Sequence, residues 1–587
     1  MQWPTISSQH RRILPYLMVV IILAAGIRLV LLGTIPPGLH PDEMDFVLTA
    51  KSIYVSGKDI SGTWSPGSLT TKKYDKPLAE LTSLVAAPII GPQLTSLWAA
   101  RLPYLINQIL LLVVVYLLTS LLVNSRVGLV AAMVWAVNPW SFQFSRLSFE
   151  APIAATCYLA AAYVILSKKR WQVMWALPWL GLGFFTYHGA KLMLVPWVVA
   201  VVGARYVWAN RRPLLKPMLG LIAAAIGLML VYGVSFNNQA AHSRSEELIP
   251  LAKNLASLSV DHDRLHSIAS PWMILFSNKG TFVIGHMVDR ELAAFSTKLL
   301  FTEGEPAGPY STHDHGFFYP LDFLLILVAL ASLYHHRPKT AVAMVALTLL
   351  APLPGVISAG NETFGHRGSL MFPLLAMFVA YGWYIVATSK HRRIYLLILV
   401  PVYILMVVNY FYLYFYRYPA YAGQDNDLGD RVLARYLMEA KKNYEHVWVV
   451  TNSSRSLEVY EQYIYYGNLL DRASAAWFAS SIQRGNYSQG NVLFVSVCPE
   501  AEQVAEQDLV VTDEQTACPV YPPLAKMNNI NLSGTAMAAP VYRIKNDRVC
   551  RQFDLNDFIH PTTWQQFRIE QLSVKDLCQT WFTKNSE

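Results

Sequence analysis

The chain has 587 residues, of which 54% are hydrophobic and only 14% are charged, and its mean hydropathy is +0.31. These values exclude an ordinary soluble protein. The formal net charge is +9, but the basic residues cluster between apolar runs, so we interpret the charge as a signal of membrane orientation and expect no nucleic-acid partner.

Apolar runs of about 20 residues, long enough to cross the hydrocarbon core of a bilayer, recur through the first 416 positions. The first run is longer than the apolar part of a signal peptide and is not followed by a small-residue cleavage site, so we expect it to remain in the protein. About eleven transmembrane helices are predicted. They lie near 13–32, 97–122, 127–144, 151–167, 171–186, 189–204, 215–235, 318–334, 340–358, 369–388 and 394–416.

Basic residues between these runs predict the orientation. They cluster at 11–12, 126, 168–170, 205, 211–212, 335–339 and 390–393. The positive-inside rule places these clusters and the N-terminus in the cytoplasm, which predicts a multi-pass protein of the cytoplasmic (inner) membrane. The outer side then receives the loops 33–96 and 236–317 and the whole of residues 417–587.

An acidic cluster follows the first predicted span directly. Asp42, Glu43 and Asp45 come just after Pro36-Pro37-Gly38, where an amphipathic segment (44–56) begins. Carboxylates held just beyond the hydrocarbon are suited to chemistry on a lipid-anchored substrate. The alternative interpretation is a solvated acidic loop without a function.

Two further charged motifs face the same side. Tyr74-Asp75-Lys76-Pro77-Leu78 lies in the same loop, and Glu150 lies in the next outer turn. Transfer from a phosphate-activated donor needs a base for the acceptor and cations for the departing phosphate, and these residue types supply both. The alternatives are that Lys76 only reaches lipid headgroups and that Glu150 is an acid favoured by the first turn of a helix.

Residues 417–587 have a different character. Runs with a strand pattern, such as 446–450 and 492–497, alternate with helix-like stretches such as 429–442. This pattern predicts an extracytoplasmic α/β domain. Four of the five cysteines lie here, and because the outer side is oxidising we expect two disulfides.

The pairing of these cysteines is open from sequence alone. We favour Cys498 with Cys518 and Cys550 with Cys578, because neighbours in sequence close the shorter loops. A zinc site is the alternative, but the sequence has no close Cys-x-x-Cys pair.

Several motifs follow one another in a fixed order over about the first 420 residues. The stronger ones are Pro-Pro-Gly-x-x-x-Asp-Glu at 36–43, Ala50-x-Ser52-Ile53, Tyr74 to Leu78, Ala100-Arg101-Leu102-Pro103 and Ser148 to Pro152. Looser ones are Gly183 to Gly189, His366-Arg367 and Tyr414 to Pro419. Together they resemble the GT-C superfamily of membrane glycosyltransferases. The nearest branch is the bacterial one related to protein O-mannosyltransferases and to the aminoarabinose transferase of lipid A.

The resemblance implies that a sugar is transferred, with inversion, from a polyprenyl-phosphate donor at the outer face. By position it implies that Asp42 is the base for the acceptor, with Glu43 beside it, and that Glu150 is the second acidic residue of the site. It also implies that Lys76, held by Asp75, contacts the donor phosphate. Glu150 stands where relatives often have Asp.

Arg367 is a further candidate for phosphate binding, because an interfacial arginine is costly without a partner. A snorkelling anchor is its simpler interpretation. Several histidines also fall on the outer side: His40, His188 and His366 are expected to be hydrogen-bonding residues of the substrate cavity.

His313-Asp314-His315 has a separate interpretation. Residues two apart share one face of a strand, so the two imidazoles could bind a divalent metal there. The sequence shows no third ligand nearby, and contact with substrate or plain loop polarity is the favoured interpretation. No other cofactor is expected.

The loop 236–317 is predicted to contain amphipathic helices at 246–258 and 261–268. We interpret it either as a lid over the catalytic cavity or as a scaffold that docks the C-terminal domain.

The sequence thus predicts an α-helical multi-pass membrane protein of GT-C type, with a catalytic domain at 1–416 and an extracytoplasmic α/β domain at 417–587. The expected partners are a polyprenyl-phosphate sugar donor, membrane lipids, and an acceptor that is a protein, a glycolipid or a cell-wall polymer. A lipid or sugar transporter is the main alternative, but we find no internal repeat and expect no acidic residue inside the spans to support it. An oligosaccharide ligase or polymerase with a diphosphate lipid donor, and an inactive relative that only binds, are the others.

Overall fold

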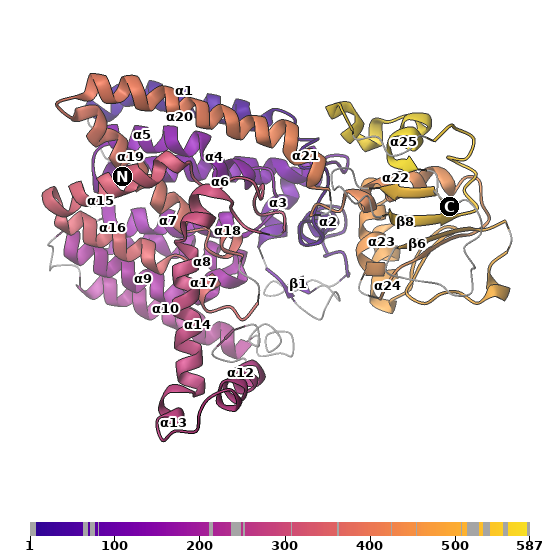
Figure 1. Cartoon of the computed structure of the whole chain (residues 1–587), viewed down its shortest axis with the longest axis horizontal. Coiled ribbons are helices and arrows are strands. Elements are labelled where there is room, and N and C mark those ends of the chain that lie inside the picture. Colours follow the sequence, from indigo (N-terminus) through magenta and orange to yellow (C-terminus); the bar gives the residue numbers. More distant parts are fainter. Residues whose placement is uncertain are drawn as a thin grey trace.

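A bundle of long helices lies beside a smaller body that contains a sheet in the computed structural model of the chain (Figure 1). The structure describes residues 8–62, 69–70, 77–79, 81–168, 170–209, 215–235, 248–249, 253–306, 308–360, 363–423, 425–453, 455–505, 507–513, 528–531, 540–555 and 561–583. Among these residues, seven helices are long and apolar enough to cross a membrane, and three further helices are shorter and apolar. The predicted helical membrane architecture is therefore confirmed.

Each predicted span contains one helix of the bundle. They are α1 (Ser8–Leu29), α4 (Leu97–Leu122), α5 (Ser125–Val137), α7 (Ala151–Ser167), α8 (Ala176–Thr186), α9 (His188–Ala209), α10 (Leu215–Ser235), α15 (Pro320–His336), α16 (Pro338–Leu350), α19 (Met371–Thr388) and α20 (Arg392–Tyr412). The fifth span is shorter than predicted, because the 3-10 helix η2 (Arg170–Trp175) precedes α8.

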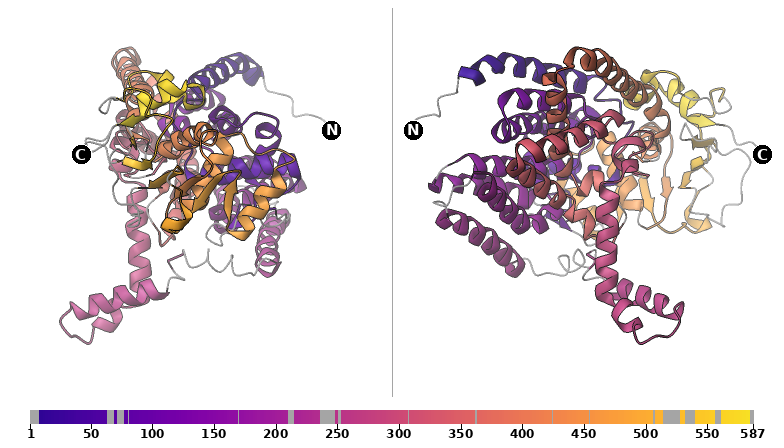
Figure 2. Two further views of the ribbon diagram at one scale, coloured as in Figure 1. Left: turned by 90° about the vertical axis from the view of Figure 1, so that its right-hand side faces the viewer. Right: turned by 60° about the vertical axis from the view of Figure 1, so that its left-hand side comes forward.

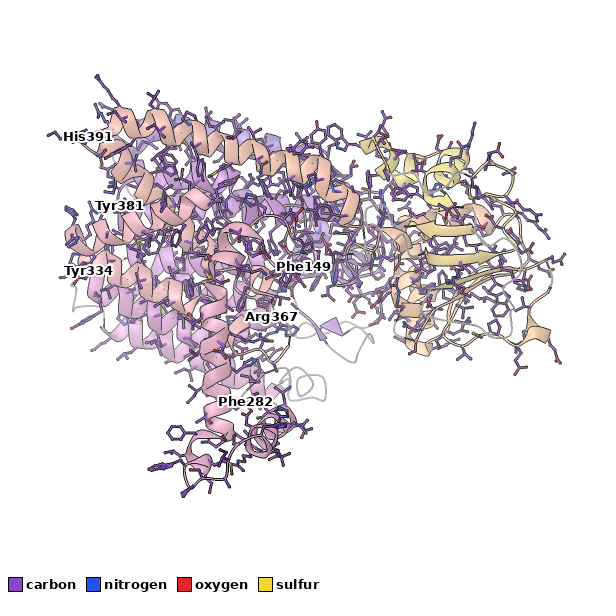
Figure 3. The ribbon with its side chains drawn as sticks, viewed as in Figure 1. Phe149, Phe282, Tyr334, Arg367, Tyr381 and His391 are labelled. Atoms are coloured by element: carbon purple, nitrogen blue, oxygen red, sulfur yellow. A yellow bond between two sulfur atoms is a disulfide. The ribbon has the colours of Figure 1, made fainter. Side chains whose placement is uncertain are left out.

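The two ends of the bundle differ. His391 and Tyr334, each next to a basic cluster, lie at the end away from the sheet, whereas Phe149 and Arg367 lie toward it (Figure 3). We call the end nearer the sheet the α/β end. It carries the short helices α2 (Pro41–Ser56), α3 (Thr82–Ile90), α6 (Pro139–Gln143), α17 (Leu353–Val356) and α18 (Phe364–Arg367), and the strand pair β1 (Leu69–Thr70) and β2 (Pro77–Leu78).

One expectation about the spans was wrong. Asp322 is an acidic residue in α15 and is fully buried. Its carboxylate accepts the backbone N–H of Tyr319 at 2.9 Å and so caps the start of the helix. The acid therefore has a local structural role in this position.

The helices α12 (Lys253–Leu265), α13 (Met273–Phe276) and α14 (Lys279–Ala294) form a hairpin that projects sideways from the bundle (Figures 1 and 2). We call it the lateral arm. One continuous helix, α12, crosses the break predicted between the helices at 246–258 and 261–268; residues 246–247 and 250–252 lie outside the described residues. The arm extends away from the sheet, so it is not the scaffold that docks the C-terminal domain.

The residues after the arm do reach the start of the C-terminal region. They continue through the π-helix η4 (Lys298–Thr302), and His313 Nε2 lies 2.9 Å from the carboxylate of Asp425. Arg417 donates a hydrogen bond to Asp314 at 3.0 Å. The bundle itself ends with the π-helix η5 (Leu413–Arg417) and α21 (Tyr418–Tyr421).

The C-terminal body is an α/β domain with seven strands in the order β4-β5-β3-β6-β8-β7-β9. The three strands β5, β3 and β6 are parallel, and the outer pairings are antiparallel. The strands are β3 (Val447–Val450), β4 (Tyr487–Gln489), β5 (Val492–Val495), β6 (Leu509–Asp513), β7 (Asn528–Asn531), β8 (Pro540–Lys545) and β9 (Phe582–Thr583). The helices are α22 (Leu428–Ala440), α23 (Arg455–Tyr466), α24 (Ala475–Arg484) and α25 (Val574–Trp581), with short 3-10 turns η6 (Ala501–Gln503), η7 (Trp564–Phe567) and η8 (Ile569–Gln571).

The disulfide predicted between Cys550 and Cys578 is present, with the two Cα atoms 5.3 Å apart. Cys498 is disulfide-bonded, and Cys518 lies outside the described residues. Cys157 is buried in α7 as a free thiol.

The α/β domain shares a hydrophobic core with α2 and α3, separate from the core of the bundle helices. Buried side chains of α2 and α3 pack with those of α22 and α23 in a single cluster. Hydrogen bonds cross the same boundary: Gln462 donates to the carbonyl of Leu39 at 3.2 Å, and Tyr465 donates to the carbonyl of Ser96 at 2.8 Å. The domain is therefore packed onto the α/β end rather than tethered to it.

The closest approach between the two bodies requires a glycine. A Cβ atom added at Gly38 would lie 1.9 Å from the carbonyl oxygen of Asn426, and a backbone atom cannot move aside cheaply. We expect Gly38→Ala to lower the free energy of unfolding by about 1–3 kcal/mol, the usual cost of overpacking, as a lower melting temperature in detergent. Gly26→Ala is the matched control, because nothing lies within 4 Å of a Cβ there; an unchanged melting temperature for Gly38→Ala would contradict the expectation.

Candidate active site at the α/β end of the bundle

Two buried arginines hold the non-helical segment that follows α1. Arg101 donates to the backbone carbonyls of Leu32, Pro36 and Gly38, each at 2.8 Å. Arg146 donates to the carbonyl of Ile35 at 3.1 Å, and also to the carbonyls of residues 28 and 30. Buried carbonyls need such partners, so these arginines fix the path of the chain into α2.

Asp42 and Glu43 lie in the first turn of α2, which His40 caps. The backbone N–H of Asp42 donates to His40 Nδ1 at 3.2 Å, and the N–H of His40 donates to the Glu43 carboxylate at 3.0 Å. Because Nδ1 accepts, it carries no proton in this geometry, so its 3.8 Å approach to the Asp42 carboxylate is not an ion pair. The Asp42 side chain is 60% exposed.

Glu43 has the opposite environment. It is fully buried, and its carboxylate also accepts the backbone N–H of Ser148. Burial raises the pKa of Glu43 to about 7, although Arg101 and the two N–H donors lower it. Glu43 thus joins the start of α2 to the turn that carries Glu150.

Glu150 and His366 meet among aromatic side chains. Glu150 precedes α7, and its carboxylate lies 3.5 Å from Nε2 of His366. The His366 ring is surrounded by Phe149, Tyr187 and Tyr310, with ring centroids 5.1, 5.0 and 5.5 Å away. The Phe149 ring also lies 6.1 Å from the ring of His40, so His40 and His366 both lie beside Phe149.

Tyr310 and Glu305 were not predicted. Both come from the loop after the lateral arm. Burial raises the pKa of Tyr310 well above its ordinary value, and the carboxylates of Asp42, Glu305 and Glu150 raise it further. Three carboxylates from distant parts of the chain therefore act electrostatically on one phenol.

Glu305 also connects this loop to α18. It is buried, and its carboxylate accepts the backbone N–H of Gly365, next to His366. The carbonyl of Gly365 accepts the indole N–H of Trp140 at 2.7 Å. These contacts hold the turn that presents His366 and Arg367.

His188 lies at the start of α9, where Lys191 Nζ is 3.1 Å from its Nδ1. Lys191 is buried and stands over the ring of Tyr232 at 4.8 Å. A functional place for Lys191 at this end of the bundle was not predicted, because its apolar neighbours in sequence put it inside the predicted span at 189–204.

His313 and His315 do not converge. The segment is not a strand, since His313 has a φ of 59°. His313 faces Asp425 and the carbonyl of Glu305, whereas the ring of His315 packs against the rings of Tyr319 and Tyr410. The interpretation that the two imidazoles share one face and bind a metal together assumed an extended backbone, and it was therefore wrong. Within the described ranges, no group of three His, Cys, Asp or Glu side chains is placed to hold a metal ion.

The remaining predicted residues are placed only in part. Asp75 and Lys76 lie outside the described residues. Arg367 is half-buried at the end of α18 and lies toward the α/β end of the bundle (Figure 3), next in sequence to His366. Among the residues that the structure describes, no carboxylate lies within ion-pair distance of its guanidinium.

The chain was compared with known families and structures. Residues 85–236 match a family model described as dolichyl-phosphate-mannose-protein mannosyltransferase. This stretch includes Glu150 and His188. No match was found among curated proteins.

Solved structures extend the likeness to the fold. ArnT from Cupriavidus metallidurans bound to undecaprenyl phosphate is 14% identical, with a TM-score of 0.50 over 91% of this chain and 98% of that chain. An oligosaccharyltransferase from Archaeoglobus fulgidus in complex with Zn and sulfate is 11% identical, with a TM-score of 0.42 over 85% of this chain and 68% of that chain. The family model and the ArnT likeness confirm the resemblance to the GT-C superfamily and a GT-C-type membrane fold.

The buried carboxyl of Glu43 predicts a pH dependence of stability. Its pKa is about 7 in the folded protein and 4.5 in an exposed chain, so between these values the folded state holds a proton that the unfolded chain releases. The contribution to stability is therefore full below about pH 4.5 and is lost as the pH rises through about 7. We expect the melting temperature of the wild type minus that of Glu43→Gln to fall between pH 5 and pH 8; a difference that is flat or rises would contradict this.

Proposed function

We propose that the protein is a glycosyltransferase that moves a sugar from a polyprenyl-phosphate donor to an acceptor at the α/β end of the bundle, with inversion at the anomeric carbon. The observation that carries the proposal is the chain of contacts that links an exposed carboxylate to a buried pair. Asp42 is hydrogen-bonded to His40, the ring of His40 lies 6.1 Å from that of Phe149, and the Phe149 ring lies 5.1 Å from His366, the partner of Glu150. ArnT, whose fold is similar, binds undecaprenyl phosphate, which supports a lipid-phosphate carrier.

Asp42 is the base in this proposal. Its side chain is 60% exposed, whereas Glu150 and Glu305 are buried, so an acceptor can reach it. It takes the proton of the acceptor hydroxyl as that oxygen attacks the anomeric carbon. The bond from the sugar to the phosphate breaks, and the phosphate leaves with its lipid. The N-terminus of α2 favours the negative charge of the base.

Glu43 and His40 position Asp42 rather than contact substrate. Glu43 is fully buried and ties α2 to the turn at Ser148. His40 caps α2 through the N–H of Asp42 itself. Glu150 orients the acceptor, and its approach to His366 leaves the imidazole as a hydrogen-bonding wall of the cavity. His188, next to Lys191, lines the same end of the bundle.

Arg367 and Lys76, with Asp75 beside it, bind the departing phosphate. Arg367 is assigned to phosphate binding because it follows His366 at the α/β end of the bundle and has no carboxylate partner among the described residues. A guanidinium in this state retains its donors for an anion.

The same proposal covers placement in the cell and the domain division. Basic clusters at one end of the bundle and the site at the other support an N-terminus in the cytoplasm and an active site on the outer face of the inner membrane. The residues 1–416 would form the catalytic domain and 417–587 an extracytoplasmic domain that positions the acceptor. A protein, a glycolipid and a cell-wall polymer are all acceptors with the required hydroxyl.

The test is sugar transfer, or slow donor hydrolysis, by the purified protein with a panel of labelled polyprenyl-phosphate sugars. We expect turnover of one donor and a loss of about 10²–10⁴-fold in Asp42→Asn, because the base is removed and the shape is kept. Asp289→Asn, an exposed acid on α14, is the matched control and should keep full activity.

Equal turnover in the wild type and Asp42→Asn would remove Asp42 from the mechanism. Turnover only with diphosphate-linked donors would contradict the donor class and favour the ligase alternative. Lipid binding with no turnover of any donor would favour transport.

Arg367→Met is expected to raise the donor KM by about 10–100-fold, since a charge-assisted contact contributes about 1.5–3 kcal/mol. The loss should appear with the lipid-linked donor and leave acceptor KM nearly unchanged. Arg392→Met, at the other end of the bundle and exposed, serves as the control. An unchanged donor KM in Arg367→Met would assign that residue to membrane anchoring instead.

A further inference from the structure

The proposed reaction makes no use of the lateral arm, whose tip is mostly apolar. Between Arg264 and Lys279 the sequence has no Asp, Glu, Lys or Arg, and His266 is the one side chain there that can take a charge. The apolar side chains of this tip stand clear of the protein, with exposed fractions of 94% for Ile268, 67% for Trp272 and 74% for Ile274. Exposed apolar surface of this extent is typical of a surface that is covered in the working protein.

The two helices that carry the tip continue this surface. On α14, exposed apolar residues follow one another at intervals of four, at Ile284, Val288 and Leu292. On α12, exposed Leu258 and Leu265 are seven residues apart. These spacings put each set on one face of its helix.

Three backbone carbonyls at the tip have side-chain donors. The side-chain NH₂ of Asn278 donates to the carbonyls of Ile274 and Leu275 at 3.2 and 2.8 Å. Arg264 Nε donates to the carbonyl of Ser277 at 2.9 Å. A turn whose carbonyls have donors of their own tolerates an environment without water.

The root of the arm fixes its level along the bundle. Arg290 donates to the carbonyl of Gly355 at 3.1 Å, and His286 Nε2 lies 3.3 Å from the carbonyl of Ser358. Both acceptors follow α16, at the end opposite the basic cluster at 335–339. The arm therefore leaves the bundle where the spans end and runs across their direction (Figure 1), and Phe282 lies along it (Figure 3).

We propose that the lateral arm lies in the bilayer leaflet nearest the α/β domain, with residues 265–278 inserted among the acyl chains of phospholipids. Lipid is favoured as the occupant because the arm leaves the bundle at the level of the span ends, and the end of α10 also exposes an apolar side chain, that of Val234. Arg264 and Lys279 then lie at the two ends of the inserted segment, where basic side chains reach lipid phosphates. This assignment does not rest on the proposed reaction.

The test measures the depth of the tip directly. Ile274→Cys is labelled with an environment-sensitive fluorophore in the full-length protein, reconstituted in phosphatidylethanolamine–phosphatidylglycerol vesicles. Cys157 is buried, and Cys550 and Cys578 form a disulfide; the wild type treated in the same way gives the background. Lipids with a nitroxide on the acyl chain report insertion, and aqueous iodide reports exposure to water. Asp263→Cys, an exposed acidic position on α12, is the matched control.

We expect several-fold stronger quenching of the label at 274 than at 263 by acyl-chain nitroxide, and the reverse order with iodide. Strong iodide quenching at 274 would overturn the proposal in favour of an arm in water. Protection from both quenchers, with a disulfide between the 274 positions of two chains in the unlabelled variant, would overturn it in favour of a second copy of the protein. Melting temperatures equal to that of the wild type show that both variants are folded.

Discussion

Two buried guanidinium groups, those of Arg101 and Arg146, determine where the candidate base lies. The segment between α1 and α2 is not helical, so its carbonyls have no partners within a helix. Arg101 and Arg146 supply those partners from α4 and from the turn before Glu150. A buried arginine would be costly alone, but the terminal nitrogens of Arg101 and Arg146 donate to carbonyls, and Glu43 places a carboxyl group near Arg101. The hydrogen bonds of Arg101 and Arg146 thus fix the path of the segment and at the same time stabilise the two buried charges. Asp42 lies at the surface, at the end of this segment.

The α/β domain holds the same segment from the other side. Arg431 of α22 donates to the carbonyl of Pro37 while its other guanidinium nitrogens pair with the carboxylate of Glu570. The chain around residues 36–39 is therefore enclosed between the bundle and the domain. Asp42 leaves this enclosure as the exposed acid, whereas Glu43, one residue later, is buried in it. Asp42 and Glu43 therefore have different proposed roles, as base and as positioning residue, because only Glu43 faces the enclosure.

Much of the fold could be predicted, because crossing a membrane demands length and apolarity and both are visible in the sequence. The strands at 446–450 and 492–497 were visible for the same kind of reason, as short β-branched runs. The order of motifs also located Asp42, Glu150 and His366, which the structure brings to one end of the bundle. Glu305 and Tyr310 were missed, since they lie in a loop without periodicity and meet the site only through the fold. Asp322 was overlooked because one acid in an apolar helix hardly changes its mean hydropathy. The interpretation of His313 and His315 as a pair of metal ligands failed, because a spacing of two residues gives a shared face only where the backbone is extended.

The contact between Gly38 and the backbone of Asn426 bears on how such a protein can evolve. Two surfaces that meet at backbone distance, with no side chain between them to absorb a change, must be inherited together. A recombinant that takes residues beyond 417 from one relative and the first loop from another would join two backbones that do not fit each other at the contact between Gly38 and Asn426. Diversification of the α/β domain is therefore expected to occur on surfaces away from α22 and α23, and chimeras that preserve function would need to exchange the segment around residues 33–62 along with the domain.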